Sequence, residues 1–345
     1  MKLKKSLQLP LFYYPTTVLL VEDDESFRET TLMNFPPNYL VDPFADPQKA
    51  ADFFHQYLKE QETQEKTLHY LTHIEDVDIE ADFKPHTAVD MTIFPVHEIV
   101  YNPRRFKTIS VLVVDRSMPR IDGLDFCRTF QTSSAQKLLM TATPMQKEAI
   151  QAFNEGVIHH FIEKNELSFF DDLNEAIHCL QQDYFNSLTQ SAMDHLNTRP
   201  HRCFKDAKFI ELFYALIEKQ AFVEYYLIDY SGSYLLFTKE GEPALLAVKS
   251  EEDMQNDYQL AEDNGAAKTV IQALKTREKL LFLFSPKDYA RSESTWGHYL
   301  HPAQILTGEK GNKFYYSLIL KPAQYKDIQL KKVVSLEAYL KTHSA

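Results

Sequence analysis

Several short apolar runs in this sequence end abruptly at polar residues that can carry chemistry. These residues are Glu22, Asp23, Asp115, Thr141 and Lys164. Carboxylates that gather in one place repel one another, and a hard divalent cation with oxygen ligands is the simplest way to keep them ionised together. Mg²⁺ suits such a group because it accepts a few carboxylates and keeps positions open for phosphate oxygens and water. Asp115 is then placed to act as a nucleophile toward a phosphoryl group, with Lys164 to neutralise the transferred charge.

For these side chains to meet, the apolar runs before them must be parallel strands of one sheet. The predicted strands are residues 17–21, 39–41, 109–114, 137–140 and 161–163. Buried parallel strands are continuous apolar runs, and their alternation with helical patterns is typical of a doubly wound α/β sheet. Ligands of such sheets bind at the carboxyl ends of the strands. We therefore predict a five-stranded parallel domain over residues 1–180, with the polar residues at one edge of its sheet.

The segment between Asp23 and Asp115 is longer than this fold needs. Two helices, one strand and their loops require roughly 40–45 residues, so about 50 residues are left over. We place this insertion at about 60–105, where the beginning is too polar for a core helix and an alternating apolar pattern around Val89–Ile93 predicts an added strand. A helix extension in solvent with a covering strand is expected here rather than a ligand site.

The remainder of the chain predicts a connector helix and a second domain. Apolar residues after Phe169 recur at spacings of three and four, which indicates an amphipathic helix over 168–197 that Pro200 ends. Residues 200–345 are typical of an α+β output domain with an antiparallel sheet. Its predicted helices are 209–217 and 267–274, and its predicted strands are 225–228, 234–237, 244–248, 280–284 and 314–320.

Bulk properties narrow the class of protein. The net charge of −12 disfavours direct binding to DNA, which requires a concentration of Lys and Arg on one face. Cys127, Cys179 and Cys203 are widely spaced, so we expect buried thiols in a reducing compartment rather than disulfides or a zinc site. Pro10 and Pro15 interrupt the apolar N-terminal run, which predicts neither a signal peptide nor a membrane span. The expectation is a cytoplasmic protein without membrane contact.

Four motifs, in order, resemble those of the receiver domains of two-component response regulators. They are Val18-Leu-Leu-Val-Glu-Asp-Asp24, Val114-Asp-Arg-Ser-Met-Pro-Arg-Ile-Asp-Gly123, Leu139-Met-Thr-Ala142, and Ala152-Phe-Asn-Glu-Gly156 through Phe161-Ile-Glu-Lys164. The resemblance implies a flavodoxin-like fold, with Asp115 as the phosphoacceptor. It implies Mg²⁺ as cofactor, with ligands from Glu22, Asp23, Asp115 and the backbone carbonyl of Ser117. It also implies Thr141 as the hydroxyl that moves toward the phosphoryl group, Lys164 as its ion-pair partner and Phe161 as the switch aromatic.

Two residues depart from the usual receiver pattern. Asn165 stands where receivers usually have proline, so the loop after Lys164 is expected to lack a cis peptide and to follow a different course. Phe161 replaces the commoner tyrosine, which removes a hydroxyl but keeps the bulk of the ring.

Three further segments resemble a proteobacterial group of quorum-sensing response regulators with an enlarged receiver and an uncharacterised output domain. They are Tyr101-Asn-Pro-Arg-Arg-Phe106, 152–161 and Glu224–Ser233. This resemblance implies input from sensor histidine kinases or phosphotransfer proteins. It implies output that controls virulence, motility or growth-phase programmes.

The sequence thus favours a phosphorylation switch that forms a homodimer when modified. Two surfaces are candidates for that dimer: the face beside Phe161, and the connector-helix stripe of Leu173, Ile177, Leu180 and Leu188. The alternative is a receiver-gated enzyme that acts on nucleotides through the C-terminal domain. It relies on the Ser231–Ser233 turn, but the acids that metal binding would need lie in the next turn instead of on the strand.

Overall fold

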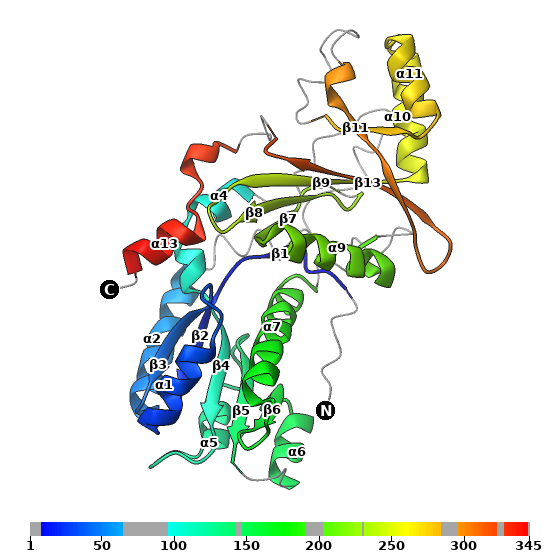
Figure 1. Cartoon of the computed structure of the whole chain (residues 1–345). Helices are drawn as coiled ribbons and strands as arrows, with labels where there is room; N and C mark the ends of the chain where they lie inside the picture. The colour runs from blue at the N-terminus through cyan, green and yellow to red at the C-terminus, as the bar shows by residue number, and fades with distance from the viewer. Residues whose placement is uncertain are drawn as a thin grey trace. The chain divides into compact units, whose positions relative to one another are not determined.

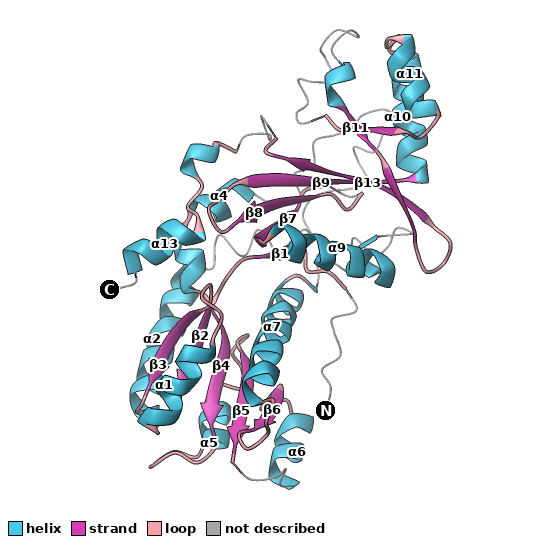
Figure 2. Cartoon of the chain, in the orientation of Figure 1, coloured by secondary structure: helices cyan, strands magenta, loops and turns pink. Residues whose placement is uncertain are grey.

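The computed structural model describes residues 8–64, 96–142, 147–190, 203–229, 231–283, 296–322 and 328–343. The described residues form two compact units. The first unit contains residues 14–64 and the described residues between 104 and 190. The second unit contains residues 8–13, residues 96–103 and the described residues between 203 and 343. Each unit has its own main sheet (Figures 1 and 2).

The first unit is built on a five-stranded parallel sheet in the order β3-β2-β4-β5-β6. Its strands are β2 (Thr17–Val21), β3 (Leu40–Phe44), β4 (Ile109–Asp115), β5 (Gln136–Thr141) and β6 (His160–Glu163). Its helices are α1 (Glu25–Asn34), α2 (Pro47–Gln64), α5 (Gly123–Thr129), α6 (Lys147–Asn154) and α7 (Phe169–Leu188). This confirms the doubly wound, flavodoxin-like prediction.

Two hydrophobic cores cover the two faces of this sheet, as a doubly wound fold requires. One core joins β2 and β4 to α2, α5 and α6 through residues such as Phe54 and Phe126. The other joins the opposite faces of β2, β4 and β5 to α1 and α7 through residues such as Leu173 and Ile177. Every residue of β2 and β4 is buried, which explains why these strands are apolar throughout.

The connector-helix stripe belongs to the second of these cores. Leu173, Ile177 and Leu180 are at most 2% exposed and pack on the sheet of their own unit. They are therefore not available as a dimer seam, and that part of the sequence prediction is wrong. Helix α7 is confirmed from Phe169 to Leu188. The helix was predicted to extend to residue 197, but residues 191–197 lie outside the described residues.

The second unit contains an antiparallel sheet in the order β1-β7-β8-β9-β13-β12. Its strands are β1 (Phe12–Tyr13), β7 (Phe222–Leu227), β8 (Tyr234–Thr238), β9 (Pro243–Ser250), β12 (Gln304–Thr307) and β13 (Lys313–Leu320). A separate pair consists of β10 (Lys279–Leu281) and β11 (Leu300–Pro302). The α+β prediction for this part of the chain is confirmed.

Helices surround this sheet and the small strand pair. They are α4 (Val96–Tyr101), α9 (Ala207–Gln220), α10 (Glu251–Asp263), α11 (Lys268–Lys275) and α13 (Leu336–His343), with 3-10 helices η3 (Cys203–Lys205), η4 (Trp296–Tyr299) and η5 (Leu330–Lys332). A further 3-10 helix, η2 (Pro103–Lys107), lies where the chain passes back into the first unit. Phe213 of α9 contacts the rings of Tyr225 and Tyr234 on the sheet, at centroid distances of 5.0 and 4.8 Å. A smaller core lies between α10, α11 and the strand pair, around Leu274 and Trp296.

The N-terminal boundary of the first unit differs from the prediction. Strand β1 pairs antiparallel with β7, with Phe12 opposite Tyr226, and the amide of Leu9 donates to the carbonyl of Phe204. Residues 8–13 therefore belong to the second unit, not to the first. Two residues flanked by prolines give no periodicity, so the sequence alone does not reveal this strand.

The end of the predicted insertion also belongs to the second unit. The carbonyl of Val100 accepts a hydrogen bond from the amide of Val334, and the Tyr101 hydroxyl accepts one from the amide of Gln329. The strand predicted around Val89–Ile93 lies outside the described residues. No helix in the described part of the chain is long and apolar enough to span a membrane.

Candidate functional site

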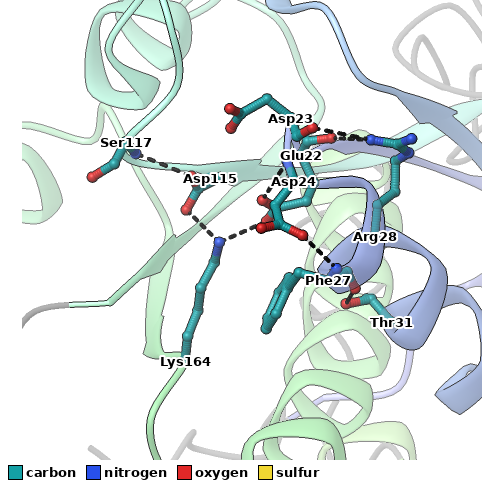
Figure 3. Close-up of polar contacts among 9 residues, drawn as sticks. All are labelled: Glu22, Asp23, Asp24, Phe27, Arg28, Thr31, Asp115, Ser117 and Lys164. Atoms are coloured by element: carbon teal, nitrogen blue, oxygen red, sulfur yellow. Dashed lines mark hydrogen bonds and ion pairs between the residues drawn. The ribbon is translucent and has the colours of Figure 1, made fainter.

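The polar residues singled out in the sequence lie at the carboxyl ends of the parallel strands. Figure 3 shows four of them, Glu22, Asp23, Asp115 and Lys164. Glu22 directly follows β2, Asp115 is the last residue of β4, Thr141 is the last residue of β5, and Lys164 directly follows β6. Parallel pairing in register sets these ends side by side, since Val21 lies opposite Val114 and Asp115 opposite Met140. The convergence expected from the fold is therefore present.

Lys164 is the cation of this site. Its Nζ lies 2.7 Å from Oε2 of Glu22 and 2.8 Å from Oδ1 of Asp115. Both acids are buried, with only 1% of the Glu22 side chain and 7% of the Asp115 side chain exposed. A single ammonium group thus bridges two buried carboxylates whose like charges repel each other.

The electrostatics of Glu22 reflect this burial. Desolvation raises the pKa of the Glu22 carboxyl above its usual 4.5, and the nearby charge of Asp115 raises it further. The hydrogen bond and positive charge of Lys164 oppose that rise in pKa. Lys164 therefore offsets only part of the cost of keeping Glu22 ionised beside Asp115.

A metal ion is the natural complement to a close group of carboxylates. Glu22, Asp23 and Asp115 each present a carboxylate oxygen within 4.8 Å of the others. Among the described residues this is the one group of three potential ligands close enough to hold an ion. Hard oxygen donors, two of them buried, fit Mg²⁺ by the chemistry of the donor set. The fourth predicted ligand, the carbonyl of Ser117, stays a prediction; the amide of Ser117 donates to Oδ2 of Asp115 at 3.2 Å.

The loop that carries the acids is fixed by the first turn of α1. Asp24 caps this helix, because its Oδ1 accepts a hydrogen bond of 2.8 Å from the amide of Phe27. Nη1 of Arg28 donates to the carbonyl of Glu22 at 2.9 Å and to that of Asp23 at 3.4 Å. The guanidinium thus ties the backbone of both candidate ligands to the helix.

The close approach of the Asp115 backbone explains why position 123 is a glycine. A Cβ atom at this position would lie only 2.2 Å from the carbonyl oxygen of Asp115. The amide of Gly123 donates to the carbonyl of Arg116 at 2.9 Å, which closes the loop on itself. A larger residue at position 123 would therefore push on the backbone of Asp115.

The remaining predicted residues are Thr141 and Phe161. Thr141 is 5% exposed, and its carbonyl accepts a hydrogen bond of 2.8 Å from the amide of Lys164. Phe161 is half-buried on β6 and packs against the core that contains α5 and α6. The movement of Thr141 and the rotation of Phe161 stay predictions.

Asn165 shows how the loop after Lys164 differs from a proline-containing one. The described residues contain no cis peptide bond, in agreement with the expectation for this loop. The Nδ2 of Asn165 donates to the carbonyl of Ala142 at 2.7 Å. A side-chain amide therefore joins the loops that follow β5 and β6.

The sequence reasoning missed Phe27 and Arg28, which contact the site from α1. Both residues are half-buried, and Nζ of Lys164 lies 4.3 Å from the centroid of the Phe27 ring. The N-cap residue Asp24 could have indicated them, because it begins a helix whose first turn must lie beside the acids.

Comparison with solved structures places the whole chain beside a response regulator. The chain is similar to the Legionella pneumophila response regulator LqsR, with 31% identity, 97% of this chain and 96% of that chain covered, and a TM-score of 0.78. The receiver domain of the Francisella response regulator 1452 matches 49% of this chain and 98% of its own at 12% identity and a TM-score of 0.31. The Thermotoga maritima response regulator TrrA, solved with Mg²⁺ and BeF, matches 48% of this chain and 98% of its own at 15% identity and a TM-score of 0.29. No protein-family model and no curated protein sequence matches the chain.

Proposed function

The chain belongs to the family of response regulators that includes LqsR, and on that premise we propose that it is a phosphorylation switch whose phosphoacceptor is Asp115. The phosphodonor is a sensor histidine kinase or a phosphotransfer protein, and the cofactor is Mg²⁺. The observation that carries this proposal is the pairing of buried Asp115 with Lys164 beside two further carboxylates.

The geometry supports a simple division of labour during transfer. A carboxylate oxygen of Asp115 attacks the phosphorus atom, and the bond from phosphorus to the donor atom breaks as the new bond forms. Lys164, 2.8 Å from that carboxylate, is placed to pair with the oxygens of the transferred group. Glu22, Asp23 and Asp115 would hold the Mg²⁺ ion, which when bound supplies positive charge beside those oxygens.

The response to phosphorylation is proposed to begin at Thr141 and Phe161. The new charge and acceptor oxygens would attract the Thr141 hydroxyl, and the space it leaves would let Phe161 turn inward. Phe161 lies half-buried on β6, so a change in its rotamer alters the surface formed by β6 and α6.

The direct test is labelling of Asp115 by a small phosphodonor such as acetyl phosphate, or by a cognate kinase, in the presence of Mg²⁺. Asp115→Asn should take up no phosphate, because an amide is not a nucleophile. Replacement of Glu22 by Gln together with Asp23 by Asn should also abolish uptake through loss of the cation. Undiminished labelling of the Asp115→Asn protein would refute the assignment.

We further propose that phosphorylation produces a homodimer. The surface beside Phe161 is the remaining candidate interface. Light scattering of wild type and Asp115→Asn, each with and without phosphodonor and Mg²⁺, tests this proposal. An unchanged mass for phosphorylated wild type would leave rearrangement within the chain as the output.

The biological setting is proposed from the same family membership. Quorum sensing, with control of virulence or growth phase, is the programme in which we place this regulator. A cytoplasmic location is proposed because Cys127, Cys179 and Cys203 are buried free thiols, which persist in a reducing compartment.

The nucleotide-handling alternative gains no support from the geometry of the described residues. Strand β8, which follows the Ser231–Ser233 turn, carries no carboxylate, and Glu240 and Glu242 lie in the next turn. Release of product from a labelled nucleotide by the purified protein would revive this alternative.

A further inference from the structure

The ring of Phe27 closes one side of the environment of Lys164. The Nζ of Lys164 lies 4.3 Å from the ring centroid, within the range in which an ammonium is attracted to an aromatic face. The same Nζ contacts Glu22 and Asp115, and only 12% of the lysine side chain is exposed. Two carboxylates and one ring therefore surround the ammonium (Figure 3).

The position of Phe27 is fixed from several directions. Its amide donates to Oδ1 of Asp24, and its carbonyl accepts a hydrogen bond of 2.8 Å from Oγ1 of Thr31. On the core side its ring contacts the ring of Phe169, at a centroid distance of 5.5 Å and an angle of 55°. Phe169 is 3% exposed and packs in the core, so Phe27 has a rigid support.

A lysine needs such a support more than most residues. Its ammonium ends a flexible four-carbon chain, and holding that chain in one geometry is entropically unfavourable. The ring restricts the side chain to the position from which it reaches both acids. It also excludes water from one side of the ammonium, which strengthens its interaction with negative charge.

We propose that Phe27 is a positioning residue for phosphoryl transfer, which holds the Lys164 ammonium at the point where it meets the transferred group. This inference rests on the proposed function of Asp115. The ring contacts the ammonium of Lys164 at 4.3 Å. It acts through the lysine alone.

The test is the initial rate of Asp115 labelling by acetyl phosphate at saturating Mg²⁺, so that metal affinity does not limit the rate. Phe27→Leu keeps an apolar side chain but removes the aromatic face, and we expect a rate about 10-fold lower than wild type. Phe27→Tyr restores the face and should label within about 2-fold of wild type. This rescue separates the role of the ring from that of apolar volume.

A matched control comes from the other end of α1. Phe35 is half-buried, packs against the same core as Phe27 and contacts Tyr39 at 5.8 Å. Phe35→Leu should leave the labelling rate unchanged. An equal loss in this variant would attribute the effect to general softening of the core and overturn the inference.

The remaining outcomes also decide the question. A wild-type rate for Phe27→Leu, or a Phe27→Tyr protein as slow as Phe27→Leu, contradicts the inference. If Phe27→Leu unfolds below the assay temperature, Phe27→Met replaces it, because methionine fills irregular space without an aromatic face. Labelling of Asp115→Asn would instead refute the proposed function, so the two failures are distinguishable.

Discussion

Removal of the lysine that bridges Glu22 and Asp115 should expose how much negative charge the site holds. In Lys164→Met the side chain keeps its length and apolar stem but loses the ammonium that lies 2.7 and 2.8 Å from the two acids. Two buried carboxylates then face each other without a cation. Loss of one partner from a buried ion pair generally destabilises a protein by about 3–5 kcal/mol.

This loss of folding stability has an upper limit, because Glu22 can bind a proton and so remove the repulsion between the two carboxylates. Its usual pKa is 4.5, and burial already raises it. Keeping a carboxyl of that pKa protonated at pH 7 costs about 3.4 kcal/mol, at 1.36 kcal/mol per pH unit, and about 0.7 kcal/mol at pH 5. The variant's folded state binds the extra proton, so its deficit must shrink as the pH falls. We expect the free energy of unfolding of Lys164→Met to be lower than that of wild type by about 3 kcal/mol at pH 7 and by less than about 1 kcal/mol at pH 5.

The assay is hydrogen–deuterium exchange of peptides that span β2 and β4, without Mg²⁺, since these strands report the stability of the first unit alone. Added Mg²⁺ should restore part of the loss by binding only the folded state, by about 2.7 kcal/mol at a concentration 100 times Kd. Arg128→Met is the matched control within the same unit, because Arg128 pairs with Asp125 at 2.7 Å while both side chains are exposed. Its effect should stay below about 1 kcal/mol. A Lys164→Met protein as stable as wild type at pH 7 would refute the reasoning, as would a deficit independent of pH.

Three further changes test other features of the structure. Gly123→Ala should destabilise the first unit by about 1–3 kcal/mol and slow phosphoryl labelling, whereas Gly297→Ala, with open space around it, should change neither the stability nor the labelling rate. Burial, and then the charge of Lys137, lower the pKa of His159 from 6.5 to about 4, so the folded state resists protonation and loses stability on acidification. His159→Asn keeps an acceptor for the amide of Lys137. In denaturant titrations, the stability that this variant loses between pH 7 and pH 5 should be about 1–2 kcal/mol smaller than the stability that wild type loses. Deletion of residues 8–13 should remove protection from hydrogen exchange in β7 but leave the protection of β4 intact.

The sequence was sufficient for the parts of the fold that are locally encoded. Strands β2 and β4 are apolar on both faces and end at acids, so their position, their parallel pairing and the convergence of their ends were all predictable. Strand β3 was only partly predicted, since it continues through Pro43 to Phe44. A proline is tolerated there because β3 lies at the edge of the sheet.

Other elements depend on partners that are distant in the sequence. Strand β1 exists because β7, some two hundred residues away, supplies its hydrogen bonds. Helix α10 was missed because it is polar and buries only Met254 and Ala261; the capping box of Ser250 and Asp253 was the signal for its start. The contact of Phe27 with Lys164 joins residues on α1 and after β6, and no spacing rule connects them.

The short strand β1 also bears on how this regulator can have evolved. It contributes buried side chains, including Leu9, Leu11 and Phe12 from its segment, to the second unit, while β2 of the first unit begins only a few residues later. Genes for many modular proteins recombine by joining one domain to another at a single linker. A crossover anywhere along α7 would here separate the second unit from its own edge strand. The two halves of this gene are therefore expected to be inherited together rather than exchanged with other receivers or other outputs.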